Sequence, residues 1–209
     1  LKRAAELDPD RFSPFPFNRY EPLAIVGAGG FGTVMRCRQV LARGREVAVK
    51  AFHAGDLDRD LNDVFAEAHT LSELVDPAII KIITWDFADR AETRPYLVME
   101  FFPGVSLFGH LKQHGPLGVA DFLAVARQVA EAMKVAHASN VLHRDLKPGN
   151  ILVRRLEGRG WDVRVIDFGL AVRFTAVQAS VSTSLPHRTR RDLSFAGSLD
   201  YASPEQKGA

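Results

Sequence analysis

The sequence of 209 residues predicts an α+β fold, in which an antiparallel five-stranded sheet with one helix precedes a mainly helical part; this length could hold one large domain or two small lobes. Two observations lead to this prediction. Residues 21–100 hold short apolar runs separated by turn residues and one helical stretch, whereas residues 101–139 repeat apolar side chains at steps of three and four. An apolar content of 46% with 25% charged residues is ordinary for a globular chain, so a packed core is expected.

Charge and cysteine content narrow the setting. A net charge of +2 gives no global argument for a nucleic-acid or membrane partner, and neither is expected of this segment. Cys37 is the single cysteine, which excludes an intrachain disulfide and fits a reducing compartment, so a cytoplasmic location is expected. The chain opens on Leu1 rather than Met and is therefore expected to be part of a longer protein, which leaves open whether another part is membrane-anchored.

Residues 1–20 are predicted to form an extended leader. Its prolines alternate with aromatic residues that are expected to pack on a lobe, and no chemistry is visible there. The residues concerned are Pro9, Phe12, Pro14, Phe15, Pro16 and Phe17.

A glycine-rich hairpin is predicted next, with strands at Leu23–Val26 and Met35–Val40. Glycines have no side chains to obstruct the backbone, which can therefore lie close over phosphates. The same Gly-x-Gly-x-x-Gly spacing occurs in dinucleotide-binding folds, but those need a helix directly after the glycines, and Val34 begins a strand-like stretch. A flexible turn without a ligand is the other alternative. The glycines are Gly27, Gly29, Gly30 and Gly32.

Three more strands and one helix complete the predicted first lobe. The strands are Glu46–Phe52, Ile79–Thr84 and Tyr96–Met99, and residues 59–75 repeat apolar side chains as a helix does. Glu67 falls inside the apolar stripe of that helix, where a solvated glutamate is out of place. A glutamate at the boundary of an amphipathic helix is the alternative.

Two helices are predicted in the second lobe. Ser106–His114 is expected to form a short helix capped by Ser106, and residues 119–139 a longer one whose apolar face includes Phe122 and Val125. His110 and His114 stand four residues apart, a spacing that can bind metal. No third ligand is evident, so two solvated histidines are expected.

A polar run between apolar flanks, Val141–Val153, carries Asp145, Lys147 and Asn150. A carboxylate can accept a proton from a hydroxyl, a lysine can meet negative charge, and an amide oxygen can bind a hard cation. Together they suit phosphoryl transfer, which needs positioning and charge neutralisation. A polar turn between two strands that carries these residues by chance is the alternative. Two strands, Ile151–Val153 and Val163–Ile166, are predicted around a solvated hairpin at Arg154–Asp162.

These motifs, taken in order, resemble those of eukaryotic-type (Hanks-type) Ser/Thr protein kinases over roughly residues 20–207. The matches run from the glycine-rich loop through His143–Asn150 and Asp167–Gly169 to Ser203–Gln206, whose form is similar to the bacterial branch. The resemblance implies a two-lobed protein-kinase-like fold with a leader at 1–20, an N-lobe at 21–100 and a partial C-lobe at 101–209.

The helices that follow the activation segment in that family are missing after Gln206, so the chain is expected to be truncated there. The apolar face of the helix at residues 119–139 is then expected to stay partly exposed.

The resemblance also implies ATP and Mg²⁺ as cofactors and assigns roles to residues. Asp145 would be the base or hydroxyl-orienting acid, Lys147 would stabilise the transferring phosphoryl group, and Lys50, fixed by Glu67, would hold the phosphates. Asn150 and Asp167 would hold magnesium. The residues implied at ATP are Gly27, Gly29, Gly32, Val34, Ala48, Lys50, Met99, Glu100, Phe102 and Leu152, with backbone groups of Glu100 and Phe102 at the adenine.

The implied function is ATP-dependent phosphorylation of protein serine or threonine, because Lys147 stands two residues after Asp145 as in Ser/Thr kinases. Protein substrates are the expected partners, with self-association for autophosphorylation. Residues 170–196 would be the activation segment, in which a phosphorylated hydroxyl would pair with Arg144; a solvated loop is the alternative. A nucleotide-binding pseudokinase and a small-molecule phosphotransferase are the competing functions.

Overall fold

The computed structural model describes residues 13–29, 32–42, 44–52, 68–158, 160–168 and 201. The chain divides into two compact units. Unit 1 comprises Leu1–Ser72 and Lys81–Phe102, and unit 2 comprises Glu73–Ile80 and Pro103–Ala209. The lobe boundaries expected after residues 20 and 100 remain predictions. Among the described residues, no helix is both long and apolar enough to span a bilayer.

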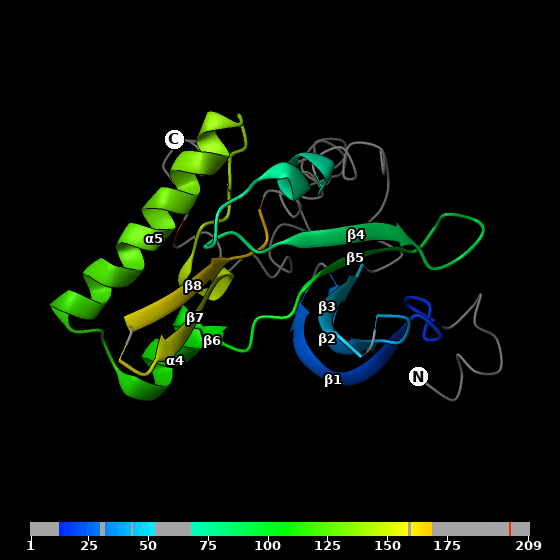
Figure 1. Cartoon of the computed structure of the whole chain (residues 1–209), viewed down its shortest axis with the longest axis horizontal. Coiled ribbons are helices and arrows are strands. Elements are labelled where there is room, and N and C mark those ends of the chain that lie inside the picture. The colour runs from blue at the N-terminus through cyan, green and yellow to red at the C-terminus, as the bar shows by residue number, and fades with distance from the viewer. Residues whose placement is uncertain are drawn as a thin grey trace, which may run out of the picture. The chain divides into compact units, whose positions relative to one another are not determined.

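Unit 1 is built on an antiparallel sheet of five strands (Figure 1). In spatial order these are β1 (Tyr20–Gly29), β2 (Gly32–Gln39), β3 (Glu46–Ala51), β5 (Pro95–Glu100) and β4 (Ile82–Phe87). The predicted five-stranded antiparallel sheet is therefore confirmed. The strand predicted at Ile79–Thr84 was wrong at its start, because Ile79 forms an isolated bridge with Val165 and the Ile80 N–H donates to the Val165 carbonyl.

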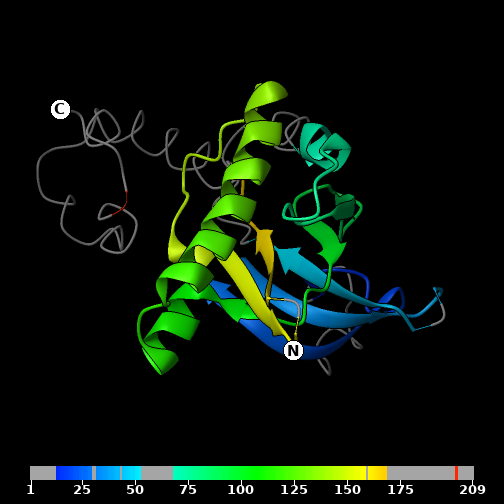
Figure 2. The same ribbon diagram turned by 60° about the vertical axis from the view of Figure 1, so that its left-hand side comes forward.

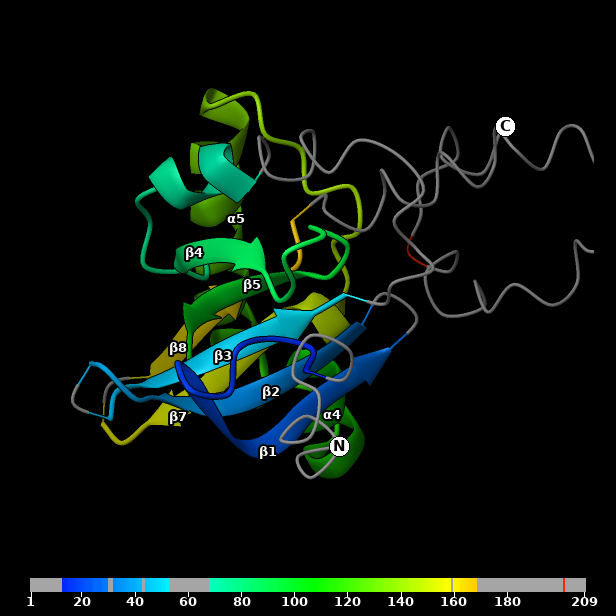
Figure 3. The ribbon, with the colours of Figure 1, turned by 90° about the vertical axis from the view of Figure 1, so that its right-hand side faces the viewer.

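Aromatic residues cover one face of the unit 1 sheet, whose strands β1 to β3 curve together in Figure 3. Phe15 is fully buried in this core, with its ring 5.2 Å from that of Phe17 and 6.3 Å from that of Tyr96. Tyr20 packs edge-on to Tyr96 at 6.0 Å. The described part of the leader thus contributes apolar area to the core of unit 1 instead of lying free of it.

Residues 68–73 are helical, and the earlier part of the helix predicted at 59–75 lies outside the described residues. The predicted helix end was wrong, because the chain leaves the helix after residue 73 and Val75 is 90% exposed. Pro77 disfavours helical geometry at Asp76, and the Asp76 carboxylate accepts a 2.8 Å hydrogen bond from the Ala78 N–H to start a turn.

Unit 2 combines a three-stranded sheet with helices. The sheet order is β6 (Val105–Ser106), β7 (Ile151–Leu156) and β8 (Gly160–Val165), and the helices are α4 (Leu107–His114), α5 (Val119–Ala138) and the 3₁₀ turn η1 (Pro148–Asn150). The Ser106 hydroxyl caps α4 as predicted, accepting from the Gly109 N–H at 3.1 Å. Helix α5 packs along β8 (Figure 2) over a buried cluster. The cluster contains Val125, Ile151, Val153, Trp161 and Val163.

Two sequence predictions in unit 2 can be compared with the structure. The apolar face of the helix predicted at 119–139 is partly exposed, as expected: Val125, Ala132 and Ala136 are buried, whereas Phe122 is 58% exposed. Residues 154–162 lie in a hairpin, as predicted, but the predicted strands were too short, because β7 and β8 continue into it and Arg154 pairs with Asp162 across the ladder with a 2.7 Å ion pair. The hairpin is also less solvated than expected, since Trp161 is buried.

Candidate functional site

Strand register places four of the residues expected at ATP on one face of the unit 1 sheet. Val34 pairs with Lys50 and Lys50 with Leu97, while Ala48 pairs with Met99. Residues directly opposite each other in a ladder point to the same face, so these side chains share a face, and it is the one opposite the aromatic core. Leu97, 5% exposed, is a member that sequence reasoning omitted; its place two residues before Met99 in a strand could have revealed it.

Lys50 is buried on this face, with 6% of its surface exposed. Its ammonium nitrogen lies 5.6 Å from the centroid of the Phe52 ring. A charge so far removed from water requires compensating partners. Glu67, the expected partner, lies outside the described residues, so the Lys50–Glu67 pair stays a prediction.

The expected phosphate-binding glycines differ in what the fold requires of them. Gly32 has a φ of 140°, and a Cβ there would overlap the carbonyl oxygen of Ala51, so the fold itself requires glycine. A Cβ on Gly27 would make an ordinary contact with Val34 at 3.7 Å, and a Cβ on Gly29 would meet nothing within 4 Å. Packing therefore gives no reason for glycine at Gly29, whereas close approach of a ligand would give one.

The chain that leaves β5 is held by hydrogen bonds within unit 1. The Glu100 N–H donates to the Lys81 carbonyl at 2.9 Å, and the Lys81 N–H donates to Glu100 Oε1 at 3.1 Å. The N–H of Glu100 is thus already engaged, which narrows the backbone groups that this residue could offer to adenine. Phe102, the other residue expected at the adenine, is 6% exposed. Leu152, also expected at ATP, lies in β7 of unit 2.

The polar loop of unit 2 gathers three of the expected catalytic and metal-binding side chains. Lys147 Nζ lies 3.0 and 2.8 Å from the two carboxylate oxygens of Asp145. Asn150 Nδ2 donates to Asp145 Oδ2 at 2.9 Å and to the Asp145 carbonyl at 2.8 Å. Arg144, just before Asp145, adopts a φ of 61°, a left-handed conformation that costs a non-glycine residue free energy and that clusters at functional sites.

The loop is also fastened to the end of β8. His143 Nε2 is 3.0 Å from the Ile166 carbonyl, and the Ile166 N–H donates to the Asn150 carbonyl at 2.9 Å. The Asp145 N–H lies 3.3 Å from His143 Nδ1, which assigns the proton to Nε2 as donor to Ile166. His143 is 3% exposed and stacks on Phe168 at 4.7 Å. Burial lowers the pKa of His143, against weaker opposing effects of its hydrogen bonds and nearby carboxylates.

Asn150 and Asp167 provide donor atoms suited to Mg²⁺. The amide nitrogen of Asn150 is committed to Asp145, which leaves its oxygen as the ligand atom, and Asp167 adds a carboxylate. Hard oxygen donors suit Mg²⁺, which usually takes only one or two carboxylates from the protein and further ligands from phosphates and water. The described residues contain no group of three His, Cys, Asp or Glu able to hold a metal ion by themselves.

A hollow elsewhere in unit 2 lies apart from these residues. Its volume is about 680 Å³, and it is lined in part by His110, His114 and Trp161, but by none of the residues expected to bind ATP or magnesium. The two histidine rings stack with centroids 4.7 Å apart, and His110 meets Trp161 edge-on at 5.0 Å. Contacts between the two rings and with Trp161 therefore account for the four-residue spacing of His110 and His114 without a metal ion.

Other sequence predictions fall outside the described residues. They concern the activation segment at 170–196, Gly169 and the Ser203–Gln206 ending, so their roles stay predictions.

Comparison with known proteins gives consistent matches. A family model described as "Protein kinase domain" matches residues 20–207. Serine/threonine-protein kinase A of Synechocystis sp. is 32% identical over 198 residues, covering 90% of this chain and 36% of that protein. Serine/threonine-protein kinase PrkC of Bacillus subtilis is 31% identical over 190 residues, covering 90% of this chain and 26% of that protein. The chain thus spans little more than a third of the first relative and less of the second.

Solved structures agree with the sequence relatives. The crystal structure of Rad53 1-466 in complex with AMP-PNP superimposes with a TM-score of 0.64 at 31% identity, covering 74% of this chain and 39% of that chain. The Mycobacterium tuberculosis PknI kinase domain superimposes with a TM-score of 0.63 at 24% identity, covering 76% of this chain and 63% of that chain, which bears on the fold alone. The predicted kinase-like fold is confirmed.

Proposed function

The chain belongs to the protein kinase family, and we propose that the protein transfers the γ-phosphoryl group of ATP to serine or threonine residues of proteins. Its bacterial relatives carry the name serine/threonine-protein kinase at 31–34% identity, which supports this choice over other phosphoryl acceptors. The lysine two residues after Asp145 supports it from the sequence.

The observation that carries the proposal is the arrangement of Lys147 and Asn150 around Asp145. Both donate hydrogen bonds to the Asp145 carboxylate, at 2.8–3.0 Å, so its orientation is fixed before any substrate binds. A fixed carboxylate can accept the hydrogen bond of a serine or threonine hydroxyl and turn its oxygen toward a phosphoryl group. The Lys147 ammonium, only 23% exposed, is then available to negative charge that develops beside Asp145.

The remaining site residues would bind and orient the nucleotide. Lys50 and the glycines Gly27, Gly29 and Gly32 would hold phosphates, and Val34, Ala48, Met99 and Leu152 would contact the base. Asn150 and Asp167 would hold Mg²⁺, which when bound neutralises charge on the nucleotide phosphates. The connection from Asn150 through the Ile166 peptide to Asp167 supports a shared role of the two ligands.

The setting and regulation follow from the same proposal. Protein substrates are the partners, with self-association for autophosphorylation, and a phosphorylated hydroxyl in residues 170–196 would pair with Arg144. A cytoplasmic location is supported by Cys37, which is fully buried and without a disulfide partner in a chain that has no other cysteine.

The test is the intact mass of the full-length protein after incubation with Mg-ATP. We expect phosphate to be added to the wild type and not to Asp145→Asn, which keeps the side-chain shape but lowers its basicity. Asp86→Asn is the matched control, because Asp86 is also an ion-paired carboxylate, 3.2 Å from Arg19, but lies in β4. A wild type that binds ATP yet gains no phosphate, alone or on an added protein substrate, would overturn the proposal in favour of a pseudokinase.

A further inference from the structure

Arg36 lies on the same face of the unit 1 sheet as the residues expected at ATP. It pairs with Ala48 across β2 and β3, one step along the face from the Val34–Lys50 pair. Its guanidinium forms a two-pronged contact with Glu46, with Nε 3.1 Å and the second nitrogen 2.6 Å from the carboxylate oxygens. Such a paired contact fixes the plane of the guanidinium as well as its position. The pKa of Glu46 is lowered, mainly by the hydrogen bonds from Arg36.

This guanidinium lies over the ring of Phe101. The Arg36 Cζ atom lies 4.8 Å from the centroid of the Phe101 ring, the geometry of a cation–π contact. Phe101 stands between Glu100 and Phe102, the two residues whose backbone groups are expected at adenine. On its other side the same segment is held by the paired hydrogen bonds between Glu100 and Lys81.

We propose that Arg36, oriented by Glu46, is a positioning residue that holds Phe101 and thereby aligns the backbone of Glu100–Phe102 for binding adenine. The inference rests on the proposed function. It also predicts which part of the nucleotide responds: because the guanidinium is engaged with Glu46 and lies over Phe101, Arg36 acts on binding of the base and not of the phosphates.

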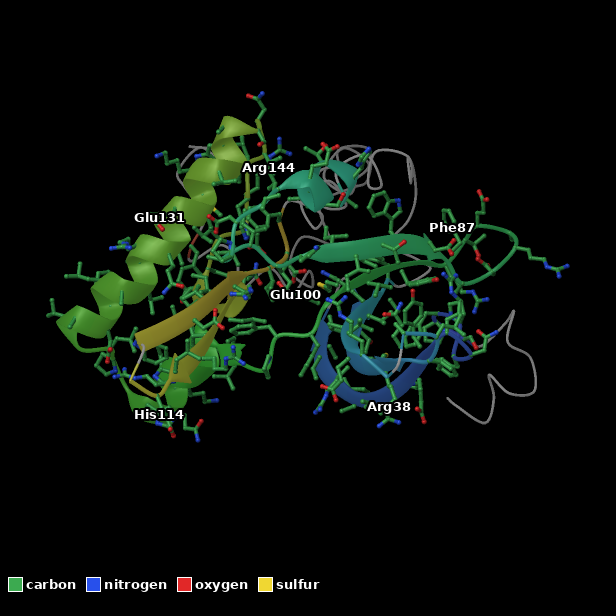
Figure 4. All side chains as sticks on the ribbon, viewed as in Figure 1. Arg38, Phe87, Glu100, His114, Glu131 and Arg144 are labelled. Atoms are coloured by element: carbon green, nitrogen blue, oxygen red, sulfur yellow. The ribbon has the colours of Figure 1, made fainter. Side chains whose placement is uncertain are left out.

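Arg38 is a matched control on the same strand. It also donates to a glutamate across the sheet, Glu21, at 3.0 Å, and its side chain is 51% exposed against 40% for Arg36. Glu21 and Arg38 are directly opposed in the β1–β2 ladder, and Figure 4 shows Arg38 apart from Glu100. Arg36→Ala and Arg38→Ala therefore each remove a glutamate-paired guanidinium from β2. Arg38 also lies opposite Glu46 in the β2–β3 ladder, but of the two arginines it is Arg36 whose guanidinium lies over Phe101.

The experiment compares the dissociation constants of adenosine and Mg-ADP for the full-length wild type, Arg36→Ala and Arg38→Ala. Adenosine carries the base without phosphates. A contact of this kind contributes a factor of about two to five in binding. We expect Arg36→Ala to raise the dissociation constants of adenosine and of Mg-ADP by the same factor, and Arg38→Ala to leave both unchanged. The autophosphorylation rate of Arg36→Ala at saturating ATP should stay within about twofold of wild type.

Three further variants separate positioning from folding. Arg36→Lys keeps the charge but not the planar group and should behave like Arg36→Ala. Phe101→Ala should show the same loss, and combining it with Arg36→Ala should add nothing, because both break one contact. Glu46→Gln should weaken the binding of adenosine and Mg-ADP less than Arg36→Ala does, since one of the two hydrogen bonds from Arg36 can persist.

Each contrary result has a distinct meaning. If Arg36→Ala bound Mg-ADP more weakly but adenosine as tightly as wild type, Arg36 would be a phosphate contact and the inference would be overturned. Equal effects of Arg36→Ala and Arg38→Ala would reduce Arg36 to a general stabilising residue and also overturn it. A wild type that binds neither adenosine nor Mg-ADP would overturn the proposed function itself, a result that the variants alone cannot produce.

Discussion

The ammonium group of Lys147 spans both carboxylate oxygens of Asp145, at 3.0 and 2.8 Å. The two residues are separated by Leu146 alone, and η1 returns the chain so that Asn150 reaches the same carboxylate. Local backbone geometry therefore builds this cluster from residues within one short segment. Because each member also orients the others, a substitution at one of them is expected to act on the position of the rest.

Replacing Lys147 tests its part in transfer. Lys147→Ala is expected to lower the autophosphorylation rate at saturating ATP by roughly a hundredfold, because the positive charge next to the transferring group is lost. The dissociation constant of adenosine should stay within about twofold, since the base is bound by other residues. The control is Lys134→Ala, which replaces an exposed lysine of α5 and should change neither the autophosphorylation rate nor the dissociation constant of adenosine. An active Lys147→Ala protein would remove this residue from the proposed site.

Replacing Asn150 tests the magnesium ligand. Asn150→Ala is expected to raise the Mg²⁺ concentration that gives half-maximal autophosphorylation by about tenfold or more, because one oxygen ligand is lost. Adenosine needs no metal, so its dissociation constant should not change. Asn150 is also 7% exposed and braces the Asp145 carbonyl, so the melting temperature must be compared first. An unchanged Mg²⁺ requirement in a folded variant would contradict the assignment.

Short-range patterns explain most of what the sequence predicted. The alternation in Glu46–Phe52 and the Ser106 cap depend on neighbouring residues, and both elements are present as β3 and α4. The sharing of a face by Val34, Lys50 and Met99 follows from the pairing of β2, β3 and β5, which local pattern alone does not give. The resemblance named these residues at ATP without predicting a strand order.

The errors arose where contacts distant in sequence decide the outcome. Phe122 shares an apolar face with Val125 by spacing, but spacing alone does not say which part of that face is covered: Val125, Ala132 and Ala136 are buried and Phe122 is exposed, and Figure 4 shows Glu131 on the outer side of the helix. The Arg36–Phe101 contact joins residues 65 positions apart (101 − 36), so no local pattern could have revealed it. Charged residues in Arg154–Asp162 suggested a solvated hairpin between short strands, whereas cross-strand pairing continues β7 and β8 into that hairpin.

Two glycines of the hairpin should respond differently to alanine. Gly32→Ala forces a Cβ against the Ala51 carbonyl at a φ of 140°, so the free energy of unfolding should fall by about 1–3 kcal/mol. Gly29→Ala meets no atom and should leave stability within about 0.5 kcal/mol. If Gly29 lies at the phosphates, Gly29→Ala should nevertheless raise the dissociation constant of Mg-ADP while leaving that of adenosine unchanged. Equal binding of Mg-ADP by Gly29→Ala and wild type would place the phosphates elsewhere.

Cys37 should be inert in the folded protein. Its side chain is fully buried, and burial raises the pKa of the thiol to about 12, so almost no thiolate exists at pH 8. A thiol reagent at pH 8 is expected to modify Cys37 only when urea unfolds unit 1, with the modified fraction following the loss of structure. Rapid modification of the native protein would show that the aromatic core over Cys37 opens readily.

His143 should make stability depend on pH in a defined window. Burial lowers its pKa in the folded state below the ordinary value of 6.5, so below that value the unfolded chain binds a proton that the folded chain does not. The free energy of unfolding should therefore be unaffected by this residue above about pH 7.5. It should fall as the pH drops through 6.5 toward the folded pKa, by up to about 1.4 kcal/mol for each pH unit. Urea unfolding at pH 7.5 and 5.5 measures the difference.

The matched pair is His143→Gln and His137→Gln, the second at an exposed position near the end of α5. His143→Gln should be less stable at both pH values, because the stack on Phe168 and the ring contact with Ile166 are lost, but its loss between pH 7.5 and 5.5 should be smaller than in wild type. His137→Gln should show the same difference in the free energy of unfolding between pH 7.5 and 5.5 as wild type. If His143→Gln also shows that difference, other groups carry the pH dependence, and His143 is held by packing without an energetic link to protonation.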